Sequence, residues 1–159
     1  DNAGIAHKTL IALSTDHYPY GLEDSEIDEL AGHPVEKNFE LYKNNFILYT
    51  KDMTPTVIDK PCSSLDIIPT ISNLLGLKYD SRLLMGKDIL SDSESLVIFR
   101  NKSFITDKGR YNSESKKFIL NEGVTIDDDY IKRISQIIDN KFYYSAKILE
   151  TDYYKKVFY

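Results

Sequence analysis

The stretch "TLIALSTDH", residues 9–17, decides how this sequence is interpreted. Residues 9–14 are a short, almost unbroken apolar run, which is typical of a strand buried on both faces of a parallel sheet. Asp16 and His17 follow directly after it. In open α/β sheets, ligands bind at the carboxyl ends of the strands. The stretch therefore predicts an α/β fold with a ligand site just after this strand.

Asp16 and His17 offer an oxygen and a nitrogen ligand of the kind that Zn²⁺ or Mn²⁺ binds. Neighbouring side chains of a regular strand point to opposite faces, so the two can share one ion only if the chain bends there. Pro19 favours such a bend, because it disfavours a helical conformation at Tyr18. The alternative is a simple turn in which Asp16 caps a backbone amide. A metal also needs three or four ligands, and the pair supplies two.

The composition is that of an ordinary globular domain. The chain has 159 residues, of which 42% are hydrophobic and 28% charged, and its formal charge of −5 argues against non-specific nucleic-acid binding. No apolar stretch approaches the roughly 18 residues of a membrane span, so we expect this piece to be soluble. The single cysteine, Cys62, excludes an internal disulfide. We expect it to be a buried or half-buried apolar residue, with a nucleophile as the alternative.

Three further segments complete the first part of the chain. Residues 21–32 predict a short acidic helix with an apolar stripe of Leu22, Ile27 and Leu30, and residues 46–49 predict a second inner strand. A helix is expected from Ser63 or Ser64 to Leu75, with Gly76 behind it. Pro69 requires a kink or a 3₁₀ first turn there.

The pattern changes near residue 93. Short strand-like pieces separated by polar turns predict a small antiparallel meander, at residues 96–99, 103–106, 110–111 and 117–120. A helix follows from about Asp127, with Ile131, Ile134, Ile137 and Ile138 on one face. We therefore predict an α/β part over residues 1–92 and an antiparallel subdomain with a C-terminal helix over residues 93–159.

Other polar residues are weaker candidates for chemistry. His7 precedes the first strand and is expected at the surface, whereas His33 lies in a loop that could fold back to the Asp-His pair. Asp66 is read as a helix-terminus charge, with a catalytic role as the alternative. Arg100 follows a strand and could bind an anion, although a surface position is expected. No nucleophile elbow or phosphate-binding glycine loop is present, so no catalytic residue is assigned in this chain.

The order of several segments resembles a known family. "TLIALSTDHYPYGL", "FILYTKD", "SSLDIIPTISNLLGL", "LLMGKDILS" and "SLVIF" are similar to the C-terminal part of the sulfatase-like domain of lipoteichoic acid synthases and related phosphoglycerol transferases, within the alkaline phosphatase superfamily. The resemblance covers roughly residues 1–120. It implies the C-terminal portion of a doubly wound α/β sheet, followed by a smaller antiparallel β subdomain.

The resemblance also implies an activity and a cofactor. Such enzymes hold a divalent metal, typically manganese with zinc and magnesium as alternatives, and Asp16 and His17 resemble two of its ligands. The family's threonine nucleophile attacks phosphatidylglycerol, an anionic phospholipid, and passes glycerol phosphate to a polymer. By this correspondence, the threonine and the other ligands lie upstream of residue 1. The missing initiator methionine agrees with the expectation of a fragment that is inactive alone.

One departure from the family motif leaves the substrate open. The synthases carry glycine after the tyrosine of their Asp-His-Tyr motif, where this chain has Pro19. Two alternatives therefore stay open: a sulfatase or phosphoethanolamine transferase of the same superfamily, and a non-catalytic binding domain.

The resemblance implies a parent protein at the extracellular face of the cytoplasmic membrane. The expected partners are the remainder of the catalytic domain upstream and, because of an exposed sheet edge, further copies of the fragment, but not nucleic acid.

Overall fold

The computed structural model describes residues 2–158, which divide into two compact units, one ending at Ile58 and the other beginning at Asp59. The fold is mixed α/β, with one two-stranded and one four-stranded antiparallel sheet and four α-helices in this described part. Within residues 2–158, none of the helices combines the length and the apolar character needed to cross a membrane. The boundary expected at residues 92 and 93 stays a prediction about the larger domain.

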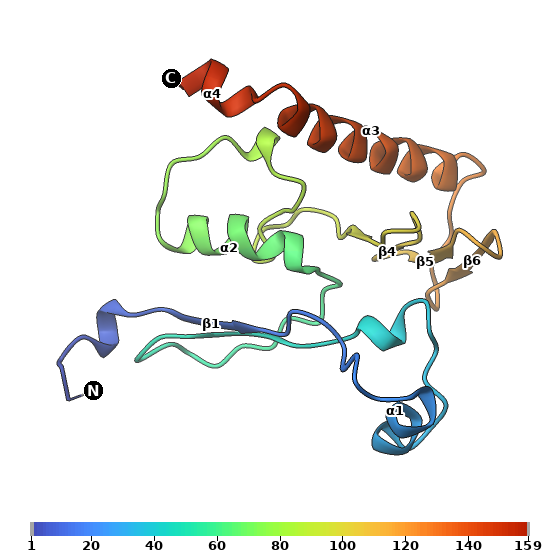
Figure 1. Cartoon of the computed structure of the whole chain (residues 1–159), viewed down its shortest axis with the longest axis horizontal. Coiled ribbons are helices and arrows are strands. Elements are labelled where there is room, and N and C mark those ends of the chain that lie inside the picture. Colours follow the sequence, from blue (N-terminus) through green and yellow to red (C-terminus); the bar gives the residue numbers. More distant parts are fainter. Residues whose placement is uncertain (1, 159) are drawn as a thin grey trace. The chain divides into compact units, whose positions relative to one another are not determined.

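The first unit is built on a two-stranded ribbon (Figure 1). Strand β1 (Ile11–Ser14) pairs with β2 (Phe46–Tyr49). Both predicted strands are confirmed, but the prediction of a parallel strand buried on both faces was wrong. The pairing is antiparallel and all four residues of β1 are exposed. An apolar run indicates surfaces suited to burial, but it carries no signal for the direction of the partner strand or for what covers the faces.

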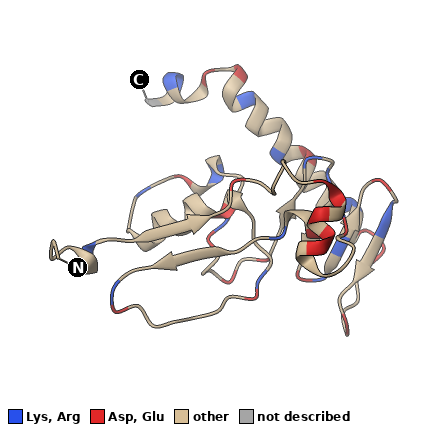
Figure 2. Ribbon diagram, turned by 60° about the horizontal axis from the view of Figure 1, so that its bottom comes forward, with Lys and Arg blue, Asp and Glu red and all other residues tan. Residues whose placement is uncertain are grey.

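A long connection between β1 and β2 holds α1 (Asp24–Ala31) and the 3₁₀-helix η2 (Glu40–Tyr42). A further 3₁₀-helix, η1 (Ala6–Lys8), precedes β1. Helix α1 begins with a capping box in which Glu23 and Glu26 satisfy each other's backbone amides, and it ends at Gly32 with φ of 75°. Its acidic residues are coloured red on the ribbon in Figure 2. No residue of α1 is fully buried. In the predicted apolar stripe, Leu22 and Ile27 are half-buried and Leu30 is 77% exposed.

The second unit begins with the predicted helix that contains Pro69. Ser63 caps a 3₁₀ turn, η3 (Ser64–Asp66), which continues into α2 (Ile67–Leu74). The expected 3₁₀ start is therefore confirmed, and Pro69 sits in the first turn of α2, where its missing N–H breaks no hydrogen bond. Gly76 follows with φ of 65°. A loop with the 3₁₀-helix η4 (Ser81–Leu83) then leads to the second sheet.

The meander is confirmed and forms the four-stranded sheet β3-β4-β5-β6. Its strands are β3 (Val97–Ile98), β4 (Phe104–Thr106), β5 (Gly109–Asn112) and β6 (Lys117–Leu120). Helix α3 (Tyr130–Glu150) lies along this sheet (Figure 1), and α4 (Tyr153–Phe158) follows it.

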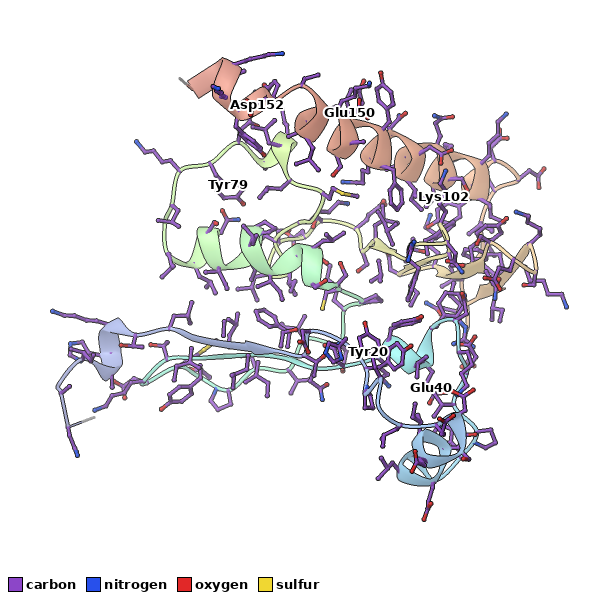
Figure 3. The ribbon with its side chains drawn as sticks, in the orientation of Figure 1. Tyr20, Glu40, Tyr79, Lys102, Glu150 and Asp152 are labelled. Carbon is purple, nitrogen blue, oxygen red and sulfur yellow. The ribbon has the colours of Figure 1, made fainter. Side chains whose placement is uncertain are left out.

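The core of the second unit lies between this sheet and α3. Phe104 and Ile138 are completely buried. The Tyr130 hydroxyl donates to Thr106 Oγ1 at 3.0 Å, and the Tyr130 ring meets Phe118 edge-on at 5.9 Å. Lys102 reaches α3 to pair with Asp139 at 2.7 Å (Figure 3). The antiparallel subdomain with a covering helix is therefore the best-packed part of the chain.

Candidate functional site

The backbone bends at Asp16 and His17, immediately after β1, and this bend brings the two side chains together. His17 Nε2 lies 3.4 Å from Asp16 Oδ2, and the His17 amide donates to Asp16 Oδ1 at 2.9 Å. Both side chains are accessible, with 86% of Asp16 and 45% of His17 exposed. The sequence required a departure from extended geometry for these residues to meet, and the structure contains it.

The hydrogen bond on the other side of the imidazole fixes its tautomer. His17 Nδ1 lies 2.7 Å from the carbonyl oxygen of Tyr18. Because a carbonyl only accepts hydrogen bonds, Nδ1 carries the proton. In the neutral ring, Nε2 then presents its lone pair toward the Asp16 carboxylate. Two acceptors facing each other in this way are stabilised by a proton or a cation between them.

An aromatic cluster surrounds the imidazole. The rings of His17 and Tyr20 are stacked, with centroids 4.2 Å apart and planes 11° apart. Tyr18 meets Tyr20 edge-on at 4.6 Å and Tyr42, at the end of η2, at 5.7 Å. The Leu22 amide donates to the Pro19 carbonyl at 3.2 Å and closes the turn that carries Tyr20. Tyr20 and Glu40 lie at the same end of the first unit (Figure 3).

The donor chemistry and spacing of the pair fit a divalent metal. Two ligands about 2.1 Å from a tetrahedral ion are about 3.4 Å apart, which is the distance measured between Nε2 and Oδ2. Residues 2–158 contain no group of three or more His, Cys, Asp or Glu side chains arranged to hold a metal. Within these residues, the pair therefore supplies two donor atoms and not a complete metal site.

The other histidines do not join the pair. His7 lies in η1, before β1, and is exposed. His33 follows α1, with Nε2 2.7 Å from Glu40 Oε1 and Nδ1 3.0 Å from the Ala31 carbonyl oxygen. Two hydrogen bonds raise the pKa of His33 above its ordinary value, the one to Glu40 with the larger effect and the one to Ala31 with the smaller. His33 therefore fastens α1 to η2, as expected for a structural loop histidine.

Asp66 has a structural role that goes beyond a helix-terminus charge. Its side chain is buried, and Oδ2 accepts the Ser63 amide at 2.8 Å while Oδ1 accepts the Lys87 amide at 2.7 Å. The Thr70 hydroxyl donates to the Asp66 carbonyl at 2.6 Å and accepts the Ile89 amide at 3.0 Å. These bonds dock the "GKDI" segment, residues 86–89, onto the start of α2. The catalytic alternative for Asp66 has no support here.

Two remaining candidates lie at the surface. Cys62 is exposed, which corrects the expectation of a buried or half-buried residue: the turn before η3 leaves it outside the packed helix. Partial desolvation, with a smaller effect of Asp66, raises the pKa of the Cys62 thiol, which disfavours the thiolate that a nucleophile needs. Arg100 lies exposed in the turn after β3, as expected for a surface residue.

Comparison with curated proteins finds lipoteichoic acid synthases among the relatives of this chain. The chain is 30% identical over 114 residues to the lipoteichoic acid synthase of Staphylococcus saprophyticus, covering 68% of this chain and 17% of that protein. It is 26% identical over 159 residues to lipoteichoic acid synthase 2 of Bacillus subtilis, covering 94% and 24%. It is 23% identical over 159 residues to the lipoteichoic acid synthase of Staphylococcus aureus, covering 96% and 24%.

These matches establish distant homology to one part of the lipoteichoic acid synthases. The chain spans no more than about a quarter of the length of the relatives it matches. No protein-family model matches the chain. The resemblance expected from the sequence motifs is therefore confirmed, and two of these alignments extend over nearly the whole chain rather than over residues 1–120 alone.

Proposed function

Because the chain is distantly homologous to part of the lipoteichoic acid synthases, we propose that it forms part of the catalytic domain of a metal-dependent phosphoglycerol transferase. The observation that carries the proposal is the Asp16–His17 pair, with its two donor atoms 3.4 Å apart directly after a strand. The relatives are named as lipoteichoic acid synthases, which makes the transfer of glycerol phosphate from phosphatidylglycerol the activity to test.

In this proposal, Asp16 and His17 are two ligands of the metal, with manganese as the first candidate and zinc or magnesium as the others. A bound divalent metal supplies charge neutralisation at phosphoryl oxygens and lowers the pKa of a hydroxyl nucleophile. Asp16 contributes the negative charge that offsets part of the charge of the ion. The Tyr18 carbonyl holds the proton of His17 on Nδ1, so that Nε2 is the free donor atom.

The proposal places the threonine nucleophile and the remaining ligands on polypeptide upstream of residue 1. It also completes the doubly wound sheet with strands from that upstream part. The ribbon supports this. Ile11 faces Tyr49 and Leu13 faces Ile47 across it, and between 45% and 58% of each of these four side chains is exposed. Opposed side chains share one face, so the ribbon presents an apolar stripe suited to packing against further structure.

The fragment alone is expected to be inactive, since a labile ion held by two ligands binds far more weakly than one held by four. The proposed location is the outer face of the cytoplasmic membrane, where the lipid donor is available. The proposed location concerns the parent protein and rests on the homology.

The test is calorimetric titration with Mn²⁺ and Zn²⁺ of this chain and of a polypeptide extended upstream through the α/β domain. Asp16→Ala and His17→Ala variants of both are titrated in parallel, with His7→Ala as the matched control because His7 is exposed and lies before β1. We expect tight binding only in the extended polypeptide, lost with Asp16→Ala or His17→Ala and kept with His7→Ala.

Metal affinity that is unchanged by Asp16→Ala and by His17→Ala would refute the metal assignment and leave the pair as a turn. An extended polypeptide that binds metal but forms its covalent intermediate on an upstream cysteine or serine would redirect the assignment to a sulfatase-like or related enzyme. Mass spectrometry of the polypeptide after incubation with phosphatidylglycerol identifies the modified residue and separates these outcomes.

A further inference from the structure

We propose that Tyr20 is a positioning residue for His17: its ring fixes the plane of the imidazole so that Nε2 faces Asp16. The proposal rests on the proposed function for its consequence in metal binding, whereas the positioning itself is a property of the chain that can be tested without metal. The stacked geometry is the primary observation, with ring centroids 4.2 Å apart and planes 11° apart.

The imidazole turns about the Cα–Cβ and Cβ–Cγ bonds of His17. The hydrogen bond between Nδ1 and the Tyr18 carbonyl oxygen, 2.7 Å long, restrains these two rotations without locking them. The Tyr20 ring removes that freedom, because a near-parallel stack is kept only while both planes stay aligned. One hydrogen bond and one stacked face together determine where Nε2 points.

Tyr20 is itself held in place from the other side. The edge of Tyr18 meets the Tyr20 ring at 4.6 Å with planes 87° apart, and Tyr18 also contacts Tyr42 at 5.7 Å. Tyr18 thus supports the imidazole twice, through its carbonyl oxygen and through its ring. The turn closed by Leu22 and Pro19 brings Tyr20 back over His17. Pro19, the residue that departs from the glycine of the family motif, belongs to this turn.

The exposure of the Tyr20 side chain favours a positioning role over a role in the core. Its side chain is 65% exposed although it touches two rings. An exposed tyrosine adds little to the stability of the unit, so its replacement is expected to change the imidazole without unfolding the chain. Outer-shell partners of metal-binding histidines orient the ring, and their loss typically costs 10–100-fold in metal affinity.

The first measurement is made on this chain without metal, by NMR with ¹³C- and ¹⁵N-labelled histidine. In the parent chain, the ring protons of His17 are expected upfield of their ordinary position, because they lie over the Tyr20 face. Tyr20→Phe keeps the face and should keep the shift, whereas Tyr20→Ala should abolish it. The control is Tyr144→Ala, which removes another exposed tyrosine, 63% accessible, from helix α3.

The second measurement is the Mn²⁺ and Zn²⁺ affinity of the upstream-extended polypeptide with the same three substitutions. Tyr20→Ala should weaken binding about 10–100-fold, while Tyr20→Phe and Tyr144→Ala should leave it close to that of the unsubstituted polypeptide. The positioning role would be overturned if the ring protons of His17 showed no upfield shift in the unsubstituted chain. It would also be overturned if Tyr20→Ala and Tyr20→Phe had equal effects. If no variant binds metal but the NMR pattern holds, the proposed function fails while the positioning of the ring by Tyr20 stands.

Discussion

The carboxylate of Asp66 accepts the backbone amide of Lys87 at 2.7 Å, across 21 positions of sequence. This single bond joins the helix segment "SSLDIIPT", residues 63–70, to the "GKD" segment, residues 86–88. Both belong to the motifs that carry the family resemblance. Their presence together in this chain therefore has a structural consequence: one supplies the acceptor and the other the donor of a partly buried contact.

Asp66→Ala is expected to destabilise the second unit by about 2–4 kcal/mol, because it leaves the Ser63 and Lys87 amides without their acceptor. Chemical denaturation followed by circular dichroism measures the loss. Asp92→Ala removes an exposed carboxylate and serves as the control. Equal stability of the two variants would show that the buried carboxylate contributes nothing beyond a surface charge.

Gly86 is required where the same loop approaches α2. A Cβ at this position would lie 2.0 Å from the Leu65 carbonyl oxygen and 2.7 Å from the Asp66 amide nitrogen, both backbone atoms. Gly86→Ala should therefore cost at least about 1–3 kcal/mol of unfolding free energy, since backbone must move. Gly21→Ala is the matched control, because nothing lies within 4 Å of its Cβ position. A thermal melt of both variants decides the point.

Tyr130→Phe tests the polar contact inside the core of the second unit. The Tyr130 hydroxyl donates to the buried Thr106 Oγ1 at 3.0 Å. Removing this donor should cost about 1 kcal/mol, the usual net value of one hydrogen bond. Tyr143→Phe, at a tyrosine that is 57% exposed, should change the denaturation midpoint much less.

The His33–Glu40 pair predicts a pH dependence of the first unit. Its hydrogen bond raises the pKa of His33 above 6.5 and lowers that of Glu40 below 4.5. The histidine contribution is complete below pH 6.5 and is lost as the pH rises through the higher folded value; the glutamate contribution is complete above pH 4.5 and is lost as the pH falls through the lower one. The pair therefore contributes fully between those two pH values.

NMR titration of the His33 ring measures this directly. The pKa of His33 should lie above that of a histidine in an unfolded peptide, and Glu40→Gln should bring it down toward that value. Glu29→Gln, which removes an exposed acid from α1, is the control. A His33 pKa that is the same in the parent and in Glu40→Gln would exclude the pairing in solution.

The exposed stripe on the ribbon predicts self-association of the isolated chain. Ile11, Leu13, Ile47 and Tyr49 present apolar area that no described residue of the first unit covers. Sedimentation velocity should show a concentration-dependent shift to larger species, which Leu13→Lys reduces by placing a charge in the stripe. Lys8→Glu, also exposed but outside the ribbon, should not have this effect. A parent chain that remains monomeric at high concentration contradicts the prediction.

Local signals predicted the elements of this chain well. The cap at Ser63, the early Pro69 and the trailing Gly76 fixed the helix between them, because caps and breakers act within one turn. The meander followed from short apolar pieces and polar turns. The bend at Asp16 and His17 was also foreseeable, since Pro19 restricts the residue before it.

The remaining features depend on contacts that no local sequence pattern specifies. The antiparallel pairing of β1 with β2 joins Ile11 to Tyr49, and no local pattern specifies the direction of a strand pair. The second role of Asp66 depends on Lys87, which a helix-terminus argument does not reach. The stack of Tyr20 on His17 was missed because an aromatic residue three positions after a histidine is common, and only the turn makes it a contact.

The ribbon also has a consequence for how this protein can vary through evolution. Four residue pairs fix the alignment of β1 with β2, and a slip by one residue would exchange the two faces of the ribbon. Insertions and deletions should therefore be excluded from residues 11–17, where they would displace Asp16 and His17, and should accumulate at residues 43–45, in the exposed return loop between η2 and β2. Length differences among homologues are expected to fall within that return loop.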